Sequence, residues 1–204
     1  MDRILVAGVG NVFLGDDAFG VEVAQRLSQR MLPQGVQVVD FGIRALDLGY
    51  ALQDGYATAI LVDTVQRNGP PGSLYVIEPD SEPARNDADM QQLSPHDMSP
   101  DSVLRLTRMM EGAGQIVLLG CEPESFGDEL EGEGRMGLSE PVAAAVDKAV
   151  ELIQSWVTQM AEQDRGLREI LGGGYAPPRV TSDAIGDIGH AGFTPILSPQ
   201  GKGV

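Results

Sequence analysis

Two neighbouring aspartates, Asp16 and Asp17, occur in a segment where an α/β protein usually binds its ligand. The segment, GNVFLGDDAFG at residues 10–20, follows a short apolar run and precedes an amphipathic helical pattern. Loops of this kind often bind phosphate through the N–H groups at the start of the helix. Two adjacent negative charges repel an anion, so the chemistry that this loop favours is the binding of a cation.

Two further residues have the side chains that a metal site needs. Asp63 follows the apolar run at 57–62, and His96 lies in a polar, proline-rich segment at 78–101. Carboxylate oxygens and imidazole nitrogen together bind divalent cations, and a site with three protein ligands keeps positions open for catalysis or ligand exchange. Taken singly, each residue has a structural explanation: Asp17 can be a helix N-cap, Asp63 can form a turn and His96 can be a solvated loop residue. These explanations do not account for all three falling at one end of the predicted sheet.

A dinucleotide site is the first alternative. Gly8 and Gly10 begin the glycine-rich pattern of such sites, but Phe13 occupies the position of the third glycine. The two aspartates that follow would also repel a pyrophosphate. The loop therefore disfavours a dinucleotide.

A cysteine hydrolase is the second alternative. Cys121 ends the run QIVLLGC and would be the nucleophile, with His96 or His190 as its base. A single cysteine after an apolar run is more often a packed side chain. The neighbouring Glu122 raises the pKa of the thiol and so opposes formation of a thiolate.

Alternating strand and helix patterns predict the elements that position these residues. Five strands are expected, at 3–8, 36–40, 57–63, 73–77 and 115–120, with helices at 21–30, 44–52, 99–110 and 139–160. The nearly unbroken apolar run at 57–63 is typical of a strand that is covered on both faces. The turn Gly69-Pro70-Pro71-Gly72 leaves no room for a crossover helix, so the strand at 73–77 is expected to be an antiparallel edge strand.

The predicted fold class is therefore α/β, with a single domain at residues 1–160. Its sheet is five-stranded, twisted and mostly parallel, and helices lie on both faces. Ligands of such sheets bind at the carboxyl ends of the strands, and the residues in or just before the loops there are Asp17, Asp40, Asp63, His96 and Cys121. Residues 161–204 are rich in glycine, proline and aspartate without a sustained period, so we expect a weakly structured C-terminal tail.

Composition excludes several classes of function. The formal net charge of −16 argues against binding of nucleic acid. No apolar run approaches the roughly 20 residues of a membrane span, and the first residues lack the pattern of a signal peptide. A single cysteine fits a reducing compartment. We expect a cytoplasmic protein that binds neither nucleic acid nor membrane.

The sequence also resembles the hydrogenase maturation endopeptidases, which process the large subunit of nickel–iron hydrogenases. The segments that carry the resemblance run in the family's order over about residues 3–157: ILVAGVGNVFLGDDAFGVEV, VVDFGIRALDL, AILVDTV, PPGSLYVIEPD, SPHDM, VLLGCEPES and GLSEPV. The opening pattern, GxGN followed four residues later by two acidic residues and then by glycine, is the most specific of them. The tail from residue 161 is expected to lie outside the resemblance.

The resemblance implies an endopeptidase that removes a C-terminal extension from a hydrogenase large-subunit precursor. It makes Asp17, Asp63 and His96 the metal ligands, with Asp17 and Asp63 as the catalytic residues and Asp16 and Asp40 in support. Nickel is expected to come with the precursor, so that cleavage tests whether the metal has been inserted. The first ligand is often glutamate in the family and is aspartate here. Many members also have Asp-Gly-Gly-Thr where this chain has DFGI at residues 40–43.

We expect the protein to be a monomer apart from its contact with the precursor. One alternative of a different class stays open, a nickel-binding maturation chaperone of the same fold that does not cleave. Since both functions use the same ligands, only turnover of the precursor distinguishes them.

Overall fold

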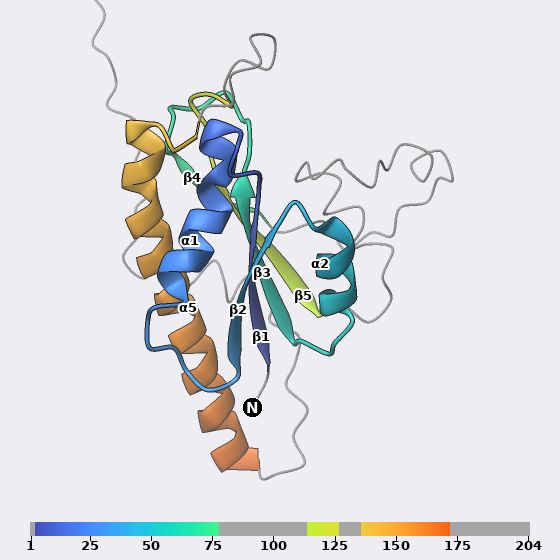
Figure 1. Ribbon diagram of the computed structural model, residues 1–204. Coiled ribbons are helices and arrows are strands. Elements are labelled where there is room, and N and C mark those ends of the chain that lie inside the picture. The colour runs from blue at the N-terminus through green and yellow to red at the C-terminus, as the bar shows by residue number, and fades with distance from the viewer. Residues whose placement is uncertain (1–2, 78–113, 127–135, 172–204) are drawn as a thin grey trace, which may run out of the picture.

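A five-stranded β-sheet forms the centre of the computed structural model, which describes residues 3–77, 114–126 and 136–171 (Figure 1). The sheet order is β2-β1-β3-β5-β4. The strands are β1 (Ile4–Val9), β2 (Val36–Gly42), β3 (Thr58–Thr64), β4 (Leu74–Ile77) and β5 (Gln115–Cys121). All neighbouring pairs are parallel except β4 with β5. The prediction of a mostly parallel sheet with one antiparallel edge strand is confirmed.

Helices cover both faces of this sheet (Figure 1). The helices α1 (Phe19–Leu27) and α5 (Glu140–Leu171) lie on one face, and α2 (Ala45–Leu52) lies on the other. Strand β3 supplies both apolar clusters, because successive side chains point to opposite faces. Ile60 and Val62 pack with α1 and α5, whereas Ala59 and Leu61 pack with α2. The apolar run in the sequence of β3 is unbroken because both faces of this strand are covered.

Glycines allow α1 and the loop before it to lie directly against the sheet. A Cβ atom on Gly20 would lie 2.0 Å from the carbonyl oxygen of Val62 and 2.3 Å from that of Val9. Gly10 has φ +132°, and its missing side chain leaves room for the carbonyl oxygen of Asp17. The glycine spacing that begins a dinucleotide pattern therefore serves close packing here.

The last helix is longer than the sequence predicts. Helix α5 continues to Leu171, and Ala161 and Asp164 on this extension are buried. The prediction of a weakly structured tail is wrong for residues 161–171, because a helical run without a glycine cap or proline has no local reason to end at Met160. Residues 172–204 and the helix predicted at 99–110 lie outside the described residues.

None of the helices in the described segments is both long and apolar enough to cross a bilayer. Most of α5 instead presents an apolar face to the sheet, with Val146, Val150, Ile153 and Val157 fully buried. The helix is amphipathic and packs on the sheet through this apolar face.

Candidate active site

The candidate site lies at the point where the strand order of the sheet reverses. Strands β1 and β3 are neighbours, with β2 on the far side of β1 and β5 on the far side of β3. The connections that leave the carboxyl ends of β1 and β3 therefore run in opposite directions, and α/β proteins bind their ligands at such a point. The loop with Asp16 and Asp17 follows β1, and Asp63 is the penultimate residue of β3.

Asp17 lies in a short 3-10 helix, η1 (Gly15–Ala18), between β1 and α1. Its carboxylate is half-buried and accepts two hydrogen bonds. The backbone N–H of Asn11 donates to Oδ2 at 2.7 Å, and the hydroxyl of Thr64 donates to Oδ1 at 3.2 Å. Burial raises the pKa of Asp17 above its ordinary value, and both hydrogen bonds oppose this shift. Each oxygen keeps a lone pair for a further partner.

Asp63 is buried, with 3% of its surface exposed, and lies close to Asp17. Burial raises the pKa of Asp63 well above its ordinary value, and the negative charge of Asp17 raises it further. The backbone N–H of Thr64 donates to Oδ1 of Asp63 at 2.7 Å, and hydrogen bonding by both the backbone and the side chain of Thr64 lowers the pKa of Asp63 in opposition to burial. The structure thus brings together two of the three predicted metal ligands as a pair of like charges.

Asp16, the neighbour of Asp17 in sequence, has a different environment. Its carboxylate is 1% exposed and accepts four hydrogen bonds. The backbone N–H groups of Glu124 and Ser125 donate to Oδ2 at 2.8 and 3.0 Å, and Ser139 donates through its N–H to Oδ1 at 2.6 Å and through its hydroxyl to Oδ2 at 2.9 Å. Asp16 therefore joins the loop after β1 to the segment after β5 and to the start of α5.

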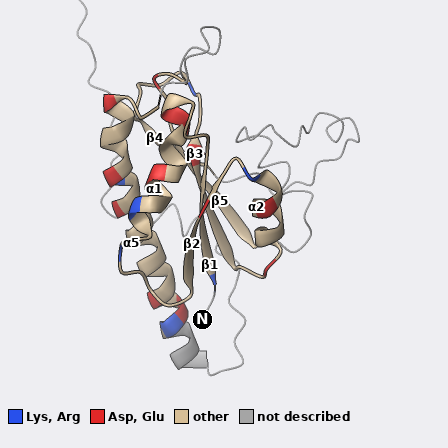
Figure 2. Ribbon diagram, in the orientation of Figure 1, with Lys and Arg blue, Asp and Glu red and all other residues tan. Residues whose placement is uncertain are grey.

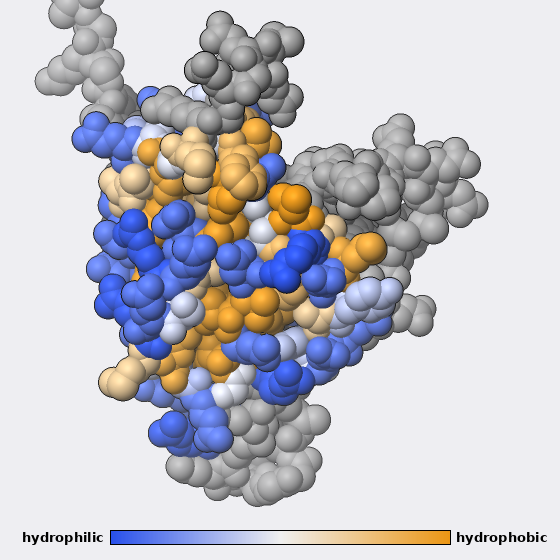
Figure 3. Space-filling model, in the orientation of Figure 1, coloured by the Kyte–Doolittle hydropathy of each residue, from blue (hydrophilic) through white to orange (hydrophobic). Residues whose placement is uncertain are grey.

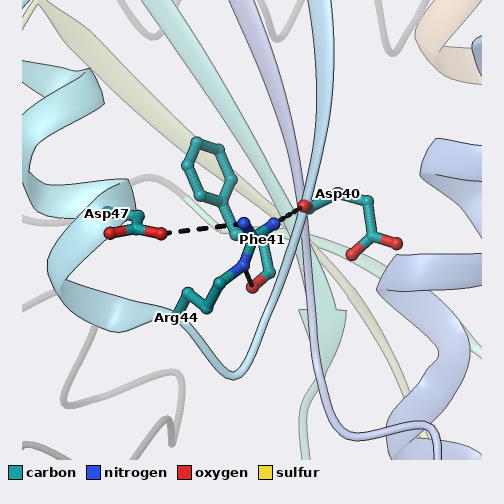
Figure 4. Close-up of polar contacts among 4 residues, drawn as sticks. All are labelled: Asp40, Phe41, Arg44 and Asp47. Atoms are coloured by element: carbon teal, nitrogen blue, oxygen red, sulfur yellow. Dashed lines mark hydrogen bonds and ion pairs between the residues drawn. The ribbon is translucent and has the colours of Figure 1, made fainter.

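Asp40 lies near the carboxyl end of β2, at the end of the sheet where the site is found. Its carboxylate points away from Arg44 and towards α1 (Figure 4), where Gln25 donates to it at 3.4 Å. Arg44 donates to the carbonyl oxygens of Asp40 and Phe41 and lies 3.7 Å from the carboxylate of Asp47. These contacts close the turn between β2 and α2. The supporting role of Asp40 in the site remains a prediction.

The third predicted ligand, His96, lies outside the described residues, which omit 78–113. Among the residues that are described, no group of three histidine, cysteine or acidic side chains is arranged to bind a metal. The pairing of Asp17 with Asp63 is therefore the part of the predicted metal site that the structure describes. The place of His96 beside them stays a prediction.

Cys121 has the surroundings of a packing residue. It is fully buried in the apolar cluster beneath α1 and α5. Burial, with the negative charges of Asp16 and Glu122, raises the pKa of its thiol to about 12. The Glu122 carboxylate accepts hydrogen bonds from the N–H of Arg67 and the hydroxyl of Tyr75, so it braces the loop after β3. A thiol that stays protonated is a poor nucleophile, which disfavours the cysteine hydrolase.

No cation in the described segments neutralises the acidic pair. The ion pairs found there are Arg26 with Asp147 and Arg44 with Asp47, and neither includes Asp17 or Asp63. Two neighbouring carboxylates with raised pKa values can share or accept a proton, and they can bind a cation that removes their repulsion. Both are properties of a site that does chemistry.

Sequence reasoning missed three residues that build this site. Thr64 touches both carboxylates, the backbone of Asn11 contacts Asp17, and Ser139 contacts Asp16. Asn11, Thr64 and Ser139 all occur within segments that carry the family resemblance, which was the available indication. Nothing in their residue types marks them, because threonine, asparagine and serine are common in loops and at strand ends.

Exposed apolar side chains lie on the two loops beside the site. Phe13 in the loop after β1 is 62% exposed, and Ile43 in the loop after β2 is 60% exposed. The N–H of Gly10 donates to the carbonyl oxygen of Gly42 and joins these loops. Figure 3 shows apolar surface on the face with the loops, set among hydrophilic residues. Such a rim is suited to contact with another polypeptide.

The fold and this site together define an α/β protein with a pair of carboxylates at the switch point of a mostly parallel sheet. A family model described as hydrogenase maturation protease (HycI) matches residues 21–156. The chain therefore belongs to the hydrogenase maturation protease family, as its sequence motifs predicted. Because the members of this family are peptidases, the protein is a peptidase.

Individual relatives support this assignment. The chain is 31% identical to the hydrogenase 2 maturation protease of Escherichia coli, over 74% of this chain and 88% of that protein. It is 28% identical to the hydrogenase expression/formation protein HupD of Rhodobacter capsulatus, over 95% of this chain and 94% of that protein. The latter similarity must extend beyond residue 160, so our expectation that the tail lies outside the resemblance is wrong for this relative.

A solved structure supports the fold. The hydrogenase maturating endopeptidase HybD from E. coli has a TM-score of 0.60 and 26% sequence identity to this chain. The similarity covers 78% of this chain and 93% of that structure. The described sheet and helices are thus those of a maturation endopeptidase.

Proposed function

We propose that this peptidase removes the C-terminal extension from the large-subunit precursor of a nickel–iron hydrogenase, and that it recognises nickel carried by that precursor. The observation that supports this most directly is the pairing of Asp17 with Asp63 at the switch point of the sheet. Family membership supports the peptidase activity and the hydrogenase as its target.

The chemistry of the acidic pair supports recognition of a cation. A buried and a half-buried carboxylate that repel one another are stabilised by a divalent ion between them. In the proposal His96 supplies a third ligand, and the remaining coordination positions are filled by the precursor. Three protein ligands hold free metal weakly, so the metal is bound well only when the precursor presents it. Nickel is therefore part of the substrate.

The same residues have a role in cleavage. Nickel held next to the scissile bond polarises its carbonyl group or a bound water. A carboxylate beside a metal-bound water is placed to accept its proton, which gives Asp17 or Asp63 a role as the general base. The exposed apolar side chains on the two neighbouring loops, Phe13 and Ile43, provide contact area for the precursor.

The decisive experiment compares nickel-loaded with nickel-free precursor as substrates of the full chain. We expect loss of the C-terminal extension, read by mass spectrometry, only with the loaded precursor. Efficient cleavage of the nickel-free form would overturn recognition of nickel. A loaded precursor that binds but is never shortened would favour the maturation chaperone.

Variants test which residues are responsible. Asp17→Asn, Asp63→Asn and His96→Ala should each lower processing by at least 100-fold while the protein stays folded. Asp54→Asn, which changes an exposed carboxylate next to α2, is the matched control and should process at the parental rate. Parental rates for two of the three site variants would refute the assignment.

A further inference from the structure

Thr64 is the residue that connects the two candidate catalytic carboxylates. Its hydroxyl donates to Oδ1 of Asp17 at 3.2 Å, and its backbone N–H donates to Oδ1 of Asp63 at 2.7 Å. The side chain is 3% exposed, so water does not easily replace the hydroxyl as a donor. One residue thus contacts two carboxylates that come from different parts of the chain.

The backbone of Thr64 is itself held firmly. It is the last residue of β3 and pairs with Cys121 of the parallel strand β5. The next N–H group, that of Val65, donates to the carbonyl oxygen of Cys121 at 2.9 Å and extends this pairing. A threonine side chain has few χ1 rotamers because it is branched at Cβ. The position of its hydroxyl therefore follows from the position of the strand.

The hydroxyl completes the set of hydrogen bonds that orient Asp17. Oδ2 of Asp17 is held by the N–H of Asn11, which belongs to the same loop. Oδ1 is held only from β3, by Thr64. With both oxygens held, the plane of the carboxylate is set relative to the strand that carries Asp63. With the Asn11 contact alone, the carboxylate can rotate away from the like charge of Asp63.

We propose that Thr64 is a positioning residue of the peptidase, whose hydroxyl holds Asp17 in register with Asp63 so that both act on the same atoms of the substrate. This inference rests on the proposed function, since it assumes that the two carboxylates work together. Misplacement of a reacting group by about 1 Å can lower a rate by about 100-fold. Loss of the hydroxyl therefore lowers kcat far more than it raises KM.

The test compares Thr64→Val with Thr64→Ser. Valine keeps the shape of the side chain and removes the hydroxyl, whereas serine keeps the hydroxyl and removes a methyl group. With nickel-loaded precursor we expect kcat to fall between 10-fold and 100-fold in Thr64→Val and by less than threefold in Thr64→Ser. A packing role predicts the opposite order, because serine then leaves a void and valine fills the site. Equal kcat for Thr64→Val and the parent would overturn the proposal.

Stability is measured alongside, so that a folding defect is not taken for a loss of positioning. Melting temperatures of both variants should lie close to that of the parent. If Thr64→Val fails to fold, Thr64→Ala replaces it, since alanine also lacks the hydroxyl and adds no larger apolar group. A folded Thr64→Ala variant with parental kcat would equally overturn the proposal.

A structural readout separates this inference from the proposed function. Crystal structures of the parent and Thr64→Val should show the Asp17 carboxylate in different orientations relative to Asp63. If the parent does not shorten the precursor, the proposed function fails, and this comparison alone decides the role of Thr64. An unchanged Asp17 orientation in the valine variant would refute the positioning role.

Discussion

At the scale of single residues, Asp16 and Asp17 show how neighbours in sequence take different tasks. Asp16 is buried, and its two carboxylate oxygens accept four hydrogen bonds. Asp17 is half-buried, accepts two hydrogen bonds and keeps free lone pairs beside Asp63. A carboxylate saturated by donors stabilises the fold, whereas one with unused capacity beside a like charge is available for chemistry.

The burial of Asp63 predicts a pH-dependent cost to folding in metal-free protein. Its pKa is raised in the folded state from an ordinary value of 3.8. The folded state thus holds the proton more tightly than the unfolded state, so protonation of Asp63 stabilises the fold. This contribution is complete below pH 3.8 and is lost as pH rises through the pKa of the folded state. Asp63→Asn removes the ionisation but keeps an oxygen for the Thr64 N–H. This variant should be more stable than the parent at pH 7, and the difference should shrink towards pH 4.

Urea unfolding at both pH values, with a chelator present, measures this difference. Asp54→Asn, at an exposed carboxylate, is the control for the substitution itself. An Asp63→Asn variant that is less stable than the parent at pH 7 would show that burial of this charge carries no net cost.

At the scale of elements, the loop from β1 to α1 carries Asp17 and depends on tight backbone packing. A Cβ atom on Gly20 would overlap the carbonyl oxygens of Val62 and Val9, and one on Gly8 would overlap the carbonyl oxygen of Gly20 and the Cβ of Ala24. Helix α1 therefore lies closer to β1 and β3 than a side chain at residue 20 would allow. This close approach brings Asp17 near the end of β3, where Asp63 and Thr64 lie.

Gly20→Ala should consequently destabilise the protein and disturb the site together. A Cβ atom 2.0 Å from a backbone oxygen forces α1 away from the sheet, and overpacking of this kind costs about 1–3 kcal/mol. Gly166→Ala in α5 is the matched control, because a Cβ there meets nothing within 4 Å and alanine should add about 0.5–1 kcal/mol in a helix. Urea unfolding measures both changes. A Gly20→Ala variant with parental stability would show that α1 can shift without cost.

At the scale of the whole molecule, the described elements form one sheet with a helical layer on each face and an acidic surface. Acidic residues are more prominent than basic ones on the helices (Figure 2), in agreement with the net charge of −16. Helix α5 runs along the face opposite α2 and continues beyond the residues that the family model matches, which end at 156. Ala161 and Asp164 are buried on this continuation.

The length of α5 predicts where the chain can be shortened. A protein that ends at Leu171 keeps all described elements and serves as the reference. A protein that ends at Met160 loses the buried turn with Ala161 and Asp164 and should be less stable, by about 1 kcal/mol or more. Thermal and urea unfolding of the two truncated proteins measure the difference. Equal stability would mean that residues 161–171 contribute nothing to the fold.

The sequence alone determined the layout of the molecule, because that layout follows from local patterns. Apolar runs predicted β1, β3 and β5, and the short connection through Gly69 and Gly72 predicted that β4 is antiparallel. Asp63 could be placed at the end of a buried strand for the same reason. The motifs around Asp17 and Asp63 predicted the family, which the comparisons confirmed.

Only the tertiary structure decided how these residues meet. Thr64 lies 47 positions from Asp17, and the Asp16 carboxylate binds Ser139, 123 positions away. A sequence pattern reports the face of an element on which a side chain lies, but not its partner on another element. The direction of the Asp40 carboxylate depends likewise on its contact with Gln25 of α1. The resemblance assigned Asp17 to the metal and Asp16 to support, but the contacts that enclose Asp16 come from Glu124, Ser125 and Ser139, and only the tertiary structure shows them.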